Sequence, residues 1–330
     1  MSSGNKGFIN HGNTCYLNSA LQCLSHIDDL NDDKFRQQFN KYKKNNTPLL
    51  NEWFSIQDKL WSDEGGSINT MNIIKVFMDK CREKSIIFNS FEQNDTSEFL
   101  IHFMDFMHDE ISRKITMNIT GEPKHNLDVL YQNNLKIFKK HFENSYSCMI
   151  ENFYSSTLTL TGCPKCNYKT DNHEPIQIIT LTLQSHYSSF IECIEEYVKL
   201  VTLDNDNKWK CDKCGEQVNP SKKTIFWDLS PIIIFLIKKY DENGVLENYI
   251  EYPKDIDMGK YGINYGGGST KYTLQGLCVH LGNLNSGHYY SICKNNKDNK
   301  WHMYNDSNVT DVNENNIFSN HPYCLFYKRV

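Results

Sequence analysis

Two matched cysteine pairs constrain this chain more than any other feature of its sequence. Cys163-Pro-Lys-Cys166 and Cys211-Asp-Lys-Cys214 repeat one spacing at two distant points of a 330-residue chain. Two intervening residues let both thiolates of a pair reach one tetrahedral metal ion from a tight turn. The sequence around each pair is typical of β-strands, so we expect two hairpins whose tips share one ion.

Zinc (Zn²⁺) is the ion that four thiolates favour, and a closed site of this kind leaves no position for water. We therefore expect a structural metal and no organic cofactor. A redox-active pair and a chance pairing are the alternatives, and two matched copies argue against both. A zinc ribbon can also bind nucleic acid, but basic residues do not cluster around these pairs. The expected ligands are Cys163, Cys166, Cys211 and Cys214.

Composition narrows the class of protein. Hydrophobic residues make up 39% and aromatic residues 13%, which is enough apolar material to fold. The net charge of -5 gives no indication of nucleic acid or of an acidic membrane surface. No segment approaches the roughly 18 apolar residues of a membrane helix. Twelve cysteines, many of them isolated, are typical of reduced thiols, so we expect an intracellular location in cytoplasm or nucleus.

The first part of the chain is predicted to be helical. Leu17, Ala20, Leu21 and Leu24 recur at helical spacing directly after Cys15. A second helix is indicated by the capping-box pattern 95–98, which precedes an apolar stripe. Residues 112–140 are polar with little periodicity, and we expect a variable connection there.

From about residue 145 the sequence favours short β-strands, which makes the chain an α+β protein. The expected strands are 153–160, 176–183, 224–229, 232–237, 272–279, 289–293 and 323–327.

Cys15 lies where a Gly- and Asn-rich loop turns into the first helix. The helix dipole and the free N–H groups of a first turn favour a thiolate. The same N–H groups can hold a developing oxyanion, to which Asn10 can add its side-chain amide. Taken alone, a buried structural cysteine is the commoner case. Cys15 acts as a nucleophile only if a base lies beside it.

His288 is the candidate base, at the start of an expected strand, with Asn305 and Asp306 at the end of the next. In a hairpin centred near residues 296 and 297, His288 faces Asn305 or Asp306 at about 5 Å between Cβ atoms. An amide or carboxylate at that distance can fix the tautomer of an imidazole. The alternative is a solvated histidine at a strand end.

These segments resemble the ubiquitin-specific proteases. Residues 7–19 look like the cysteine box of that family, and residues 280–309 look like its histidine box. Residues 91–100 resemble its central glutamine–aspartate segment, and the runs 229–240 and 323–327 also fit. The cysteine pairs stand where the family has its zinc-bearing fingers, and the matches keep the family's order along almost the whole chain.

The resemblance implies a papain-like cysteine protease with a helical thumb, a β-rich palm and zinc-bearing β fingers. Residues 1–330 would form one catalytic domain, with 1–145 mainly thumb, 146–235 mainly fingers and 236–330 mainly palm. Thumb and palm would grip the C-terminal tail of ubiquitin while the fingers cradle its globular part. We expect ubiquitin and ubiquitinated proteins as partners of a monomer, with no nucleic acid and no membrane.

The boxes also imply individual roles. Cys15 is implied as nucleophile, His288 as general base and Asn305 as the orienting third residue. Asn10 is implied as oxyanion donor, with Asp306 in a supporting position. The implied contacts to the substrate tail are Gln93, Asp95, Gly287 and Tyr289. For Asp95 an N-cap of the following helix is an equally good interpretation.

The implied reaction is deubiquitination. The Cys15 thiolate attacks the carbonyl of the terminal Gly-Gly of ubiquitin, whether it is held in an isopeptide or a linear bond. Water activated by His288 then hydrolyses the acyl-enzyme. One alternative is a catalytically inactive ubiquitin-binding scaffold, although every catalytic position is filled. Another is a protease for a ubiquitin-like modifier that ends in the same glycine pair. A nucleic-acid-binding zinc ribbon leaves both boxes unexplained.

Overall fold

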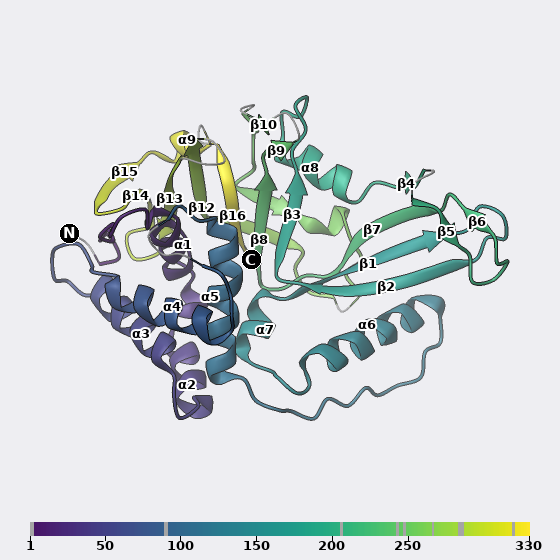
Figure 1. The fold of residues 1–330 in the computed structure, drawn as a ribbon, viewed down its shortest axis with the longest axis horizontal. Coiled ribbons are helices and arrows are strands. Elements are labelled where there is room, and N and C mark those ends of the chain that lie inside the picture. The colour runs from purple at the N-terminus through teal and green to yellow at the C-terminus, as the bar shows by residue number, and fades with distance from the viewer. Residues whose placement is uncertain are drawn as a thin grey trace.

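The structure is a computed structural model, and its chain order confirms the predicted α+β class (Figure 1). Helices occupy most of the first half, and strands occupy most of the second. The described residues are 3–88, 92–204, 207–241, 244–246, 249–265, 267–282, 287–318 and 321–330.

The helices before the first strand are α1 (Cys15–Ser25), α2 (Asp33–Tyr42), α3 (Pro48–Leu60), α4 (Met71–Glu83), α5 (Thr96–Ile111), α6 (Asn126–Phe142) and α7 (Cys148–Phe153). Short helical turns η1 (Asp28–Leu30) and η3 (Met258–Lys260) and helices α8 (Phe190–Tyr197) and α9 (Glu314–Ile317) complete the set among the described residues. Helices α2 to α5 pack together, and α1 lies between α5 and the strands (Figure 1).

Helix α1 is buried along its whole length, although its sequence carries polar residues on one side. All 11 of its residues are buried. Its polar side chains find partners inside the protein: Gln22 donates to the Lys6 carbonyl at 2.9 Å, and Ser19 donates to the Tyr16 carbonyl at 2.9 Å. A buried polar group costs little when it is hydrogen-bonded, so these bonds allow the helix to lie in the core.

The strands form a small and a large sheet. The small sheet has the order β2-β1-β7-β4, and the large sheet has the order β15-β14-β13-β12-β16-β8-β3 with β11 added on β12. Every pairing in both is antiparallel except β3 with β8. The small sheet contains β1 (Ser155–Gly162), β2 (Lys169–Ile176), β4 (Val201–Thr202) and β7 (Ser221–Asp228). The large sheet contains β3 (Ile178–Thr182), β8 (Ile232–Lys238), β11 (Asp255–Asp257), β12 (Lys271–Gly282), β13 (Gly287–Asn295), β14 (Lys300–Asn305), β15 (Asn308–Val312) and β16 (Pro322–Arg329).

Each predicted strand overlaps an observed one. Two further strand pairs are short: β5 (Trp209–Lys210) with β6 (Gln217–Val218), and β9 (Tyr240–Asp241) with β10 (Gly244–Val245). In Figure 1 the small sheet extends away from α1 to α5, with α6 alongside β2, and ends near β5 and β6. The range 146–235 was expected to be mainly fingers. Strand β3 lies within this range and β8 lies at its edge, but both strands belong to the large sheet.

Strand β8 explains why its sequence is apolar without alternation. Ile232 and Ile234 pack in the core that contains α1 and α5, whereas Ile233, Phe235 and Ile237 pack in the core that contains α8. Both faces of the strand are therefore buried. A continuous apolar run is the sequence pattern expected of such a strand.

The prediction of a variable connection over residues 112–140 is wrong in its second half, where α6 begins at Asn126. Of its 17 residues only Asn134 and Phe142 are buried. Apolar residues do recur along it at helical spacing, but most of them are exposed or half-buried: Leu127, Tyr131, Leu135 and Phe138. Polar contacts also hold the helix. Asp128 accepts hydrogen bonds from the backbone N–H groups of Lys124 and His125, and Asn133 donates to Asp171 of β2 at 3.1 Å.

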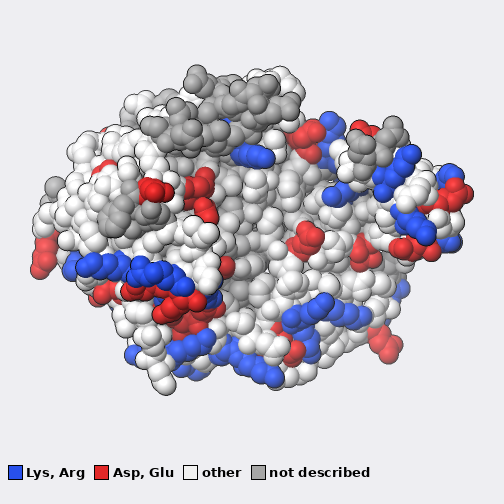
Figure 2. Space-filling view, in the orientation of Figure 1, with Lys and Arg blue, Asp and Glu red and all other residues white. Residues whose placement is uncertain are grey.

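Charged side chains of both signs are interspersed on the face shown in Figure 2, over the helices and over the far end of the small sheet. The area between these two regions carries few charged groups. Within the described residues, no helix combines the length and apolar character needed to cross a membrane.

Glu110 provides the first test of this fold. Its buried carboxylate accepts from the N–H groups of Leu49 and Leu50 at 3.1 and 2.8 Å and pairs with Lys80 at 2.8 Å. It takes the place of an N-cap for α3, because Thr47 makes no side-chain cap. We expect Glu110→Ala to lower the free energy of unfolding by about 3 kcal/mol, measured in urea.

The matched control is Asp109→Ala, which removes an exposed carboxylate from the same helix. It should change the free energy of unfolding by no more than about 0.5 kcal/mol. Equal effects of the two substitutions would contradict the capping role of Glu110.

Candidate functional site

Cys15 is the first residue of α1, and the loop before it is shaped by two left-handed residues. Gly12 has φ of 91° and Asn13 has φ of 53°, conformations that glycine and asparagine tolerate. Thr14 makes no side-chain cap on the helix. The backbone N–H groups of Cys15 and Tyr16 lower the pKa of the Cys15 thiol by hydrogen-bonding to the sulfur.

Burial raises the pKa of the Cys15 thiol. The backbone N–H of Tyr289 opposes this effect by hydrogen-bonding to the sulfur, while the nearby charge of Asp306 adds to the rise. The thiol is thus held mainly protonated in the absence of a base. The contact with Tyr289 also places the sulfur next to the start of β13, which carries His288.

His288 and Asn305 form a hydrogen-bonded pair. His288 Nε2 lies 2.7 Å from Asn305 Oδ1. An amide oxygen only accepts, so this bond places the proton on Nε2 and leaves Nδ1 as the basic nitrogen of the neutral ring. Strands β13 and β14 pair as predicted, with Asn295 opposite Lys300, so the hairpin centre lies one residue beyond the predicted position.

Asp306 has different partners from its neighbour. Its carboxylate accepts from Asn10 Nδ2 at 2.9 Å and from Asn18 Nδ2 at 2.8 Å. Asn10 Oδ1 in turn accepts from the Gly12 and Thr14 N–H groups at 2.9 and 3.2 Å. The side chain of Asp306 thus ties the loop before Cys15 to the first turns of α1.

Two features around Asp306 were not found by sequence reasoning. Asn18 is a buried amide within a helix, and only its partner across the fold gives it a role. Gly7 lies so close to the chain that a Cβ there would stand 2.2 Å from the Asp306 carbonyl oxygen. The sequence shows Asn18 as a polar residue in a mostly apolar helix and Gly7 at the start of the cysteine box. Neither signal identifies the partner of the residue.

The side-chain amide of Gln93 hydrogen-bonds to both the N–H and the carbonyl of Gly287. Its Oε1 accepts from the Gly287 N–H at 2.8 Å, and its Nε2 donates to the Gly287 carbonyl at 3.2 Å. This pair joins the segment before α5 to the residue that precedes His288. The structure thereby brings two of the predicted tail contacts together, beside the candidate base.

Asp95 is the N-cap of α5, as one of the two interpretations predicted. Its Oδ1 accepts from the Ser97 and Glu98 N–H groups at 2.6 and 3.2 Å, and its Oδ2 accepts from the Tyr323 hydroxyl. Tyr323 belongs to an aromatic group with Tyr289 and His280, in which His280 stacks on Tyr289 at 4.4 Å between ring centroids. The four predicted tail residues therefore line one region.

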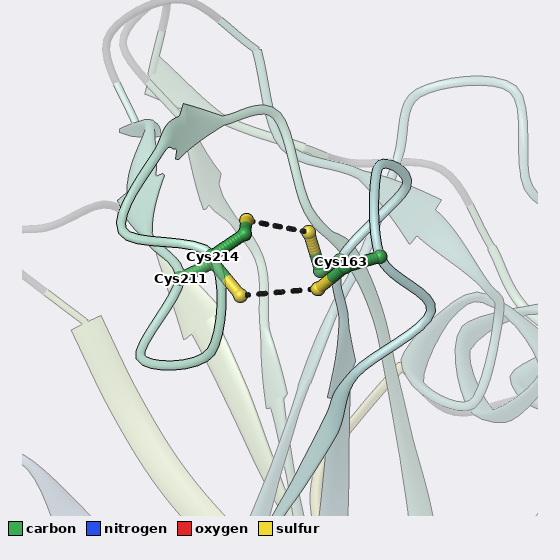
Figure 3. A group of neighbouring side chains, drawn as sticks. Cys163, Cys211 and Cys214 are labelled. Atoms are coloured by element: carbon green, nitrogen blue, oxygen red, sulfur yellow. Dashed lines mark hydrogen bonds between the residues drawn. The ribbon is translucent and has the colours of Figure 1, made fainter.

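The four paired cysteines converge at the end of the small sheet (Figure 3). This end lies away from α1, the helix that begins with Cys15 (Figure 1). Cys163 and Cys166 lie between β1 and β2, and Cys211 and Cys214 lie between β5 and β6. Their sulfur atoms all lie within 4.8 Å of one another. Within the described residues this is the one group of three or more such side chains that could hold a metal ion.

The geometry fits a tetrahedral ion. Cys163 Sγ lies 3.9 Å from Cys214 Sγ, and Cys166 Sγ lies 3.6 Å from Cys211 Sγ. A tetrahedral ion with metal–sulfur distances near 2.3 Å holds its ligands about 3.8 Å apart. Although burial opposes it, hydrogen bonds from the backbone of the knuckle lower the pKa of Cys163 to about 7. The pKa values of Cys166 and Cys214 are raised against a backbone hydrogen bond to each sulfur, with burial and neighbouring cysteine sulfurs among the causes, so the metal-free cluster favours one thiolate rather than four.

The two knuckles fold alike. Cys163 N–H bonds the Tyr168 carbonyl at 2.8 Å, and Cys211 N–H bonds the Glu216 carbonyl at 2.9 Å. In each knuckle the residue after the second cysteine, Asn167 or Gly215, has a positive φ. Equal turns explain why both pairs share one spacing.

Comparison with known proteins gives consistent results. A family profile described as "UCH: Ubiquitin carboxyl-terminal hydrolase" matches residues 6–327. The hydrolase Usp2 of Drosophila melanogaster is 27% identical, with 100% of this chain and 35% of the relative covered. Ubiquitin carboxyl-terminal hydrolase 21 of Homo sapiens is 26% identical, with 99% and 62% covered. The chain thus spans less than two thirds of the length of these relatives.

Solved structures share the fold. One similar chain comes from the structure described as the SAGA Ubp8/Sgf11/Sus1/Sgf73 DUB module bound to ubiquitin aldehyde. Its TM-score is 0.77 at 22% sequence identity, and the match covers 99% of this chain and 70% of that one. The papain-like arrangement of helices, large sheet and projecting small sheet is therefore that of a known fold.

The effect of the Asp306 charge on the pKa of Cys15 can be measured directly. We expect Asp306→Asn to lower the pKa of Cys15, because this carboxylate is one of the groups that raise it. The midpoint of Cys15 alkylation by iodoacetamide, followed by mass spectrometry across a pH series, should move to lower pH. Asp63→Asn, an exposed substitution elsewhere, should leave the midpoint unchanged. An unchanged or higher midpoint in Asp306→Asn would refute this electrostatic role.

Proposed function

The chain belongs to the ubiquitin carboxyl-terminal hydrolase family, and from this premise we propose that it is a deubiquitinating thiol protease. It hydrolyses the bond that follows the terminal Gly-Gly of ubiquitin, whether isopeptide or linear. The observation that carries the proposal is the His288–Asn305 hydrogen bond, formed beside a cysteine at the N-terminus of a buried helix. Nucleophile, base and orienting group are the three parts that such chemistry needs.

Each residue has a distinct task in the proposed mechanism. Nδ1 of His288 takes the proton of Cys15, and the thiolate attacks the scissile carbonyl. The imidazolium then protonates the departing amine. Asn305 holds the ring in the productive tautomer throughout, because its oxygen accepts from Nε2.

The oxyanion is stabilised from the loop and helix around the nucleophile. The first-turn N–H groups of α1 and the side-chain amide of Asn10 supply the donors. Asp306 supports Asn10 by accepting one of its two amide protons, which aims the second proton away from the carboxylate. Deacylation reverses the first step, with a water molecule in place of the amine.

The substrate tail is proposed to lie between α5 and the start of β13. Gln93 and Gly287 bound this path on one side, and the aromatic group of Tyr289 stands beside it. Asp95 uses one oxygen for its cap, so the other oxygen, shared with Tyr323, is the one left for a cation on the tail. The proposed subdomains follow: thumb before residue 146, fingers around the four cysteines, and palm in the remainder.

The resident metal of the fingers is proposed to be zinc, held by all four cysteines as a closed structural site. Its task is to join the two knuckles. Few apolar groups do so among the described residues, where Cys163, Cys211 and Val218 are the buried members of the local core and Tyr168 and Trp209 pack half-buried against them. We also infer that the chain works as a monomer on ubiquitin and ubiquitinated proteins, inside the cell, where its thiols stay reduced.

A ubiquitin molecule that carries a C-terminal electrophile tests the nucleophile and the modifier together. We expect one covalent adduct per chain, mapped to Cys15 by intact mass and peptide analysis. Cys15→Ala should form no adduct and lose hydrolysis by at least about a thousandfold, while its affinity for ubiquitin stays within about threefold.

Cys148→Ala is the matched control, because it removes another buried thiol and should keep both adduct and activity. No adduct from the zinc-loaded, folded protein would reject the proposed activity. A plain binding assay would then separate an inactive ubiquitin-binding scaffold from a protease for a ubiquitin-like modifier.

Metal analysis tests the fingers. We expect one zinc ion per chain, and we expect Cys163→Ser to raise KM for a ubiquitin substrate by about fivefold or more while kcat changes less than about twofold. The reason is that the knuckles hold the part of the surface that meets the globular substrate. Lys165→Ala, an exposed neighbour that is no ligand, should preserve zinc and KM. A zinc-free preparation with unchanged KM and thermal stability would defeat the structural role.

A further inference from the structure

Three cysteines that the proposed mechanism does not use meet in the core below the site. Cys23 Sγ lies 3.6 Å from Cys278 Sγ and 3.7 Å from Cys293 Sγ. All three side chains are at most 1% exposed. Cys23 is the central member, in contact with both of the others.

The three thiols come from the elements that build the active site. Cys23 lies on α1, which begins with Cys15, and Cys293 lies on β13, which carries His288 near its start. Cys278 lies on the neighbouring strand β12. A bond between Cys23 and Cys293 would join the helix of the nucleophile to the strand of the base.

The packing leaves Cys23 and Cys293 facing each other. Gly276 of β12 lies opposite Cys293, and a Cβ on it would stand 3.3 Å from Cys293 Sγ and 3.5 Å from Cys23 Sγ. Because glycine has no side chain, nothing from β12 separates the two sulfurs at this level.

His26 gives Cys293 a partner that the other two thiols lack among the described residues. The ring is held by the Gln22 carbonyl at Nδ1 and by the Tyr304 hydroxyl at Nε2, both at 2.8 Å. Burial raises the pKa of Cys293, but hydrogen bonds from Cys23 and His26 outweigh this effect and lower it to about 6. Burial alone lowers the pKa of His26, and the sulfur of Cys293 reverses that shift. A lowered pKa favours the thiolate form of Cys293.

We propose that Cys23 and Cys293 are a second reactive thiol site, which hydrogen peroxide converts into a reversible disulfide between α1 and β13. The site is separate from Cys15, and its reaction does not depend on the proposed hydrolytic activity. The reactant is a small hydroperoxide, because only a molecule near the size of water can reach sulfurs this deep during brief openings of the core.

The chemistry balances in two steps. The Cys293 thiolate attacks one peroxide oxygen, the O–O bond breaks, and the departing hydroxide takes the proton of His26 to become water. Cys293 is now a sulfenic acid. The sulfur of Cys23 attacks it, the S–S bond forms, the S–O bond breaks, and the oxygen leaves as water with the thiol proton of Cys23. Two thiols are oxidised and one peroxide is reduced.

The disulfide changes the site because the sulfurs must approach. A disulfide has an S–S length of about 2.05 Å, against the 3.7 Å that separates these two sulfurs. The remaining distance is closed by rotation of side chains and by movement of α1 against β13. Displacements of about 1 Å between catalytic groups lower rates on the order of a hundredfold.

Peptide mapping of the Cys15→Ala variant tests the proposal without interference from Cys15. After hydrogen peroxide treatment of this zinc-loaded chain, we expect a slow mass loss of about 2 Da and a linked peptide that contains Cys23 and Cys293. Dithiothreitol should remove both signals. Adding Cys293→Ser should abolish the linked peptide, whereas adding Cys278→Ser should preserve it.

The same peroxide treatment of the chain with Cys15 intact gives the functional arm. Arsenite, which reduces sulfenic acids and leaves disulfides, should restore Cys15 but not the full rate. A loss of tenfold or more in kcat should remain until dithiothreitol is added, and Cys293→Ala should show no such remainder.

Three outcomes would overturn the proposal. One is a linked peptide that joins Cys23 to Cys278. Another is full alkylation of Cys23 and Cys293 after unfolding of the treated protein, with oxidation confined to the zinc ligands. The third is a mapped Cys23–Cys293 disulfide that leaves kcat unchanged. Failure of the ubiquitin electrophile to react would reject the proposed function but would leave the mapping in Cys15→Ala intact.

Discussion

Burial of α1 on every side is the constraint on which the candidate site depends. A helix with no free face can carry polar residues only where the surrounding chain supplies partners. Residues 3–10 and Asp306 meet this need. Gln22 donates to the Lys6 carbonyl, and Asn18 donates to the Phe8 and Ile9 carbonyls and to the Asp306 carboxylate. The partners that make the helix acceptable in the core are therefore the same groups that fix the position of Cys15.

Asn305 and Asp306 show how one turn separates two functions. Asp306 has φ of 51°, a left-handed conformation, which directs its side chain to Asn10 and Asn18 while that of Asn305 meets His288. Adjacent residues in a strand already face opposite ways, and the turn at Asp306 adds a change of direction. The carboxylate thus organises the nucleophile's loop, and the amide organises the base.

Sequence reasoning succeeded where a local pattern has one physical meaning. The two knuckles have the predicted common geometry, and the predicted cap of α5 by Asp95 is present. Strand pairing alone could not choose between Asn305, the last residue of β14, and Asp306, because the register was known only to about one residue. The choice of Asn305 rested on the family resemblance. Sequence reasoning missed α6, whose apolar positions are interrupted by Asn134 and mostly half-buried. It also missed the partners of Asn18 and Gly7, which depend on contacts hundreds of residues apart.

The two knuckles present their sulfurs from the same kind of backbone turn. An ion held between them would contact only the four sulfurs. The geometry of the knuckles does not depend on the length of β1, β2 and β7, so residues added in register to those strands would move the knuckles outward without changing them. The length of the small sheet can therefore change in evolution while the metal-binding knuckles at its end stay the same.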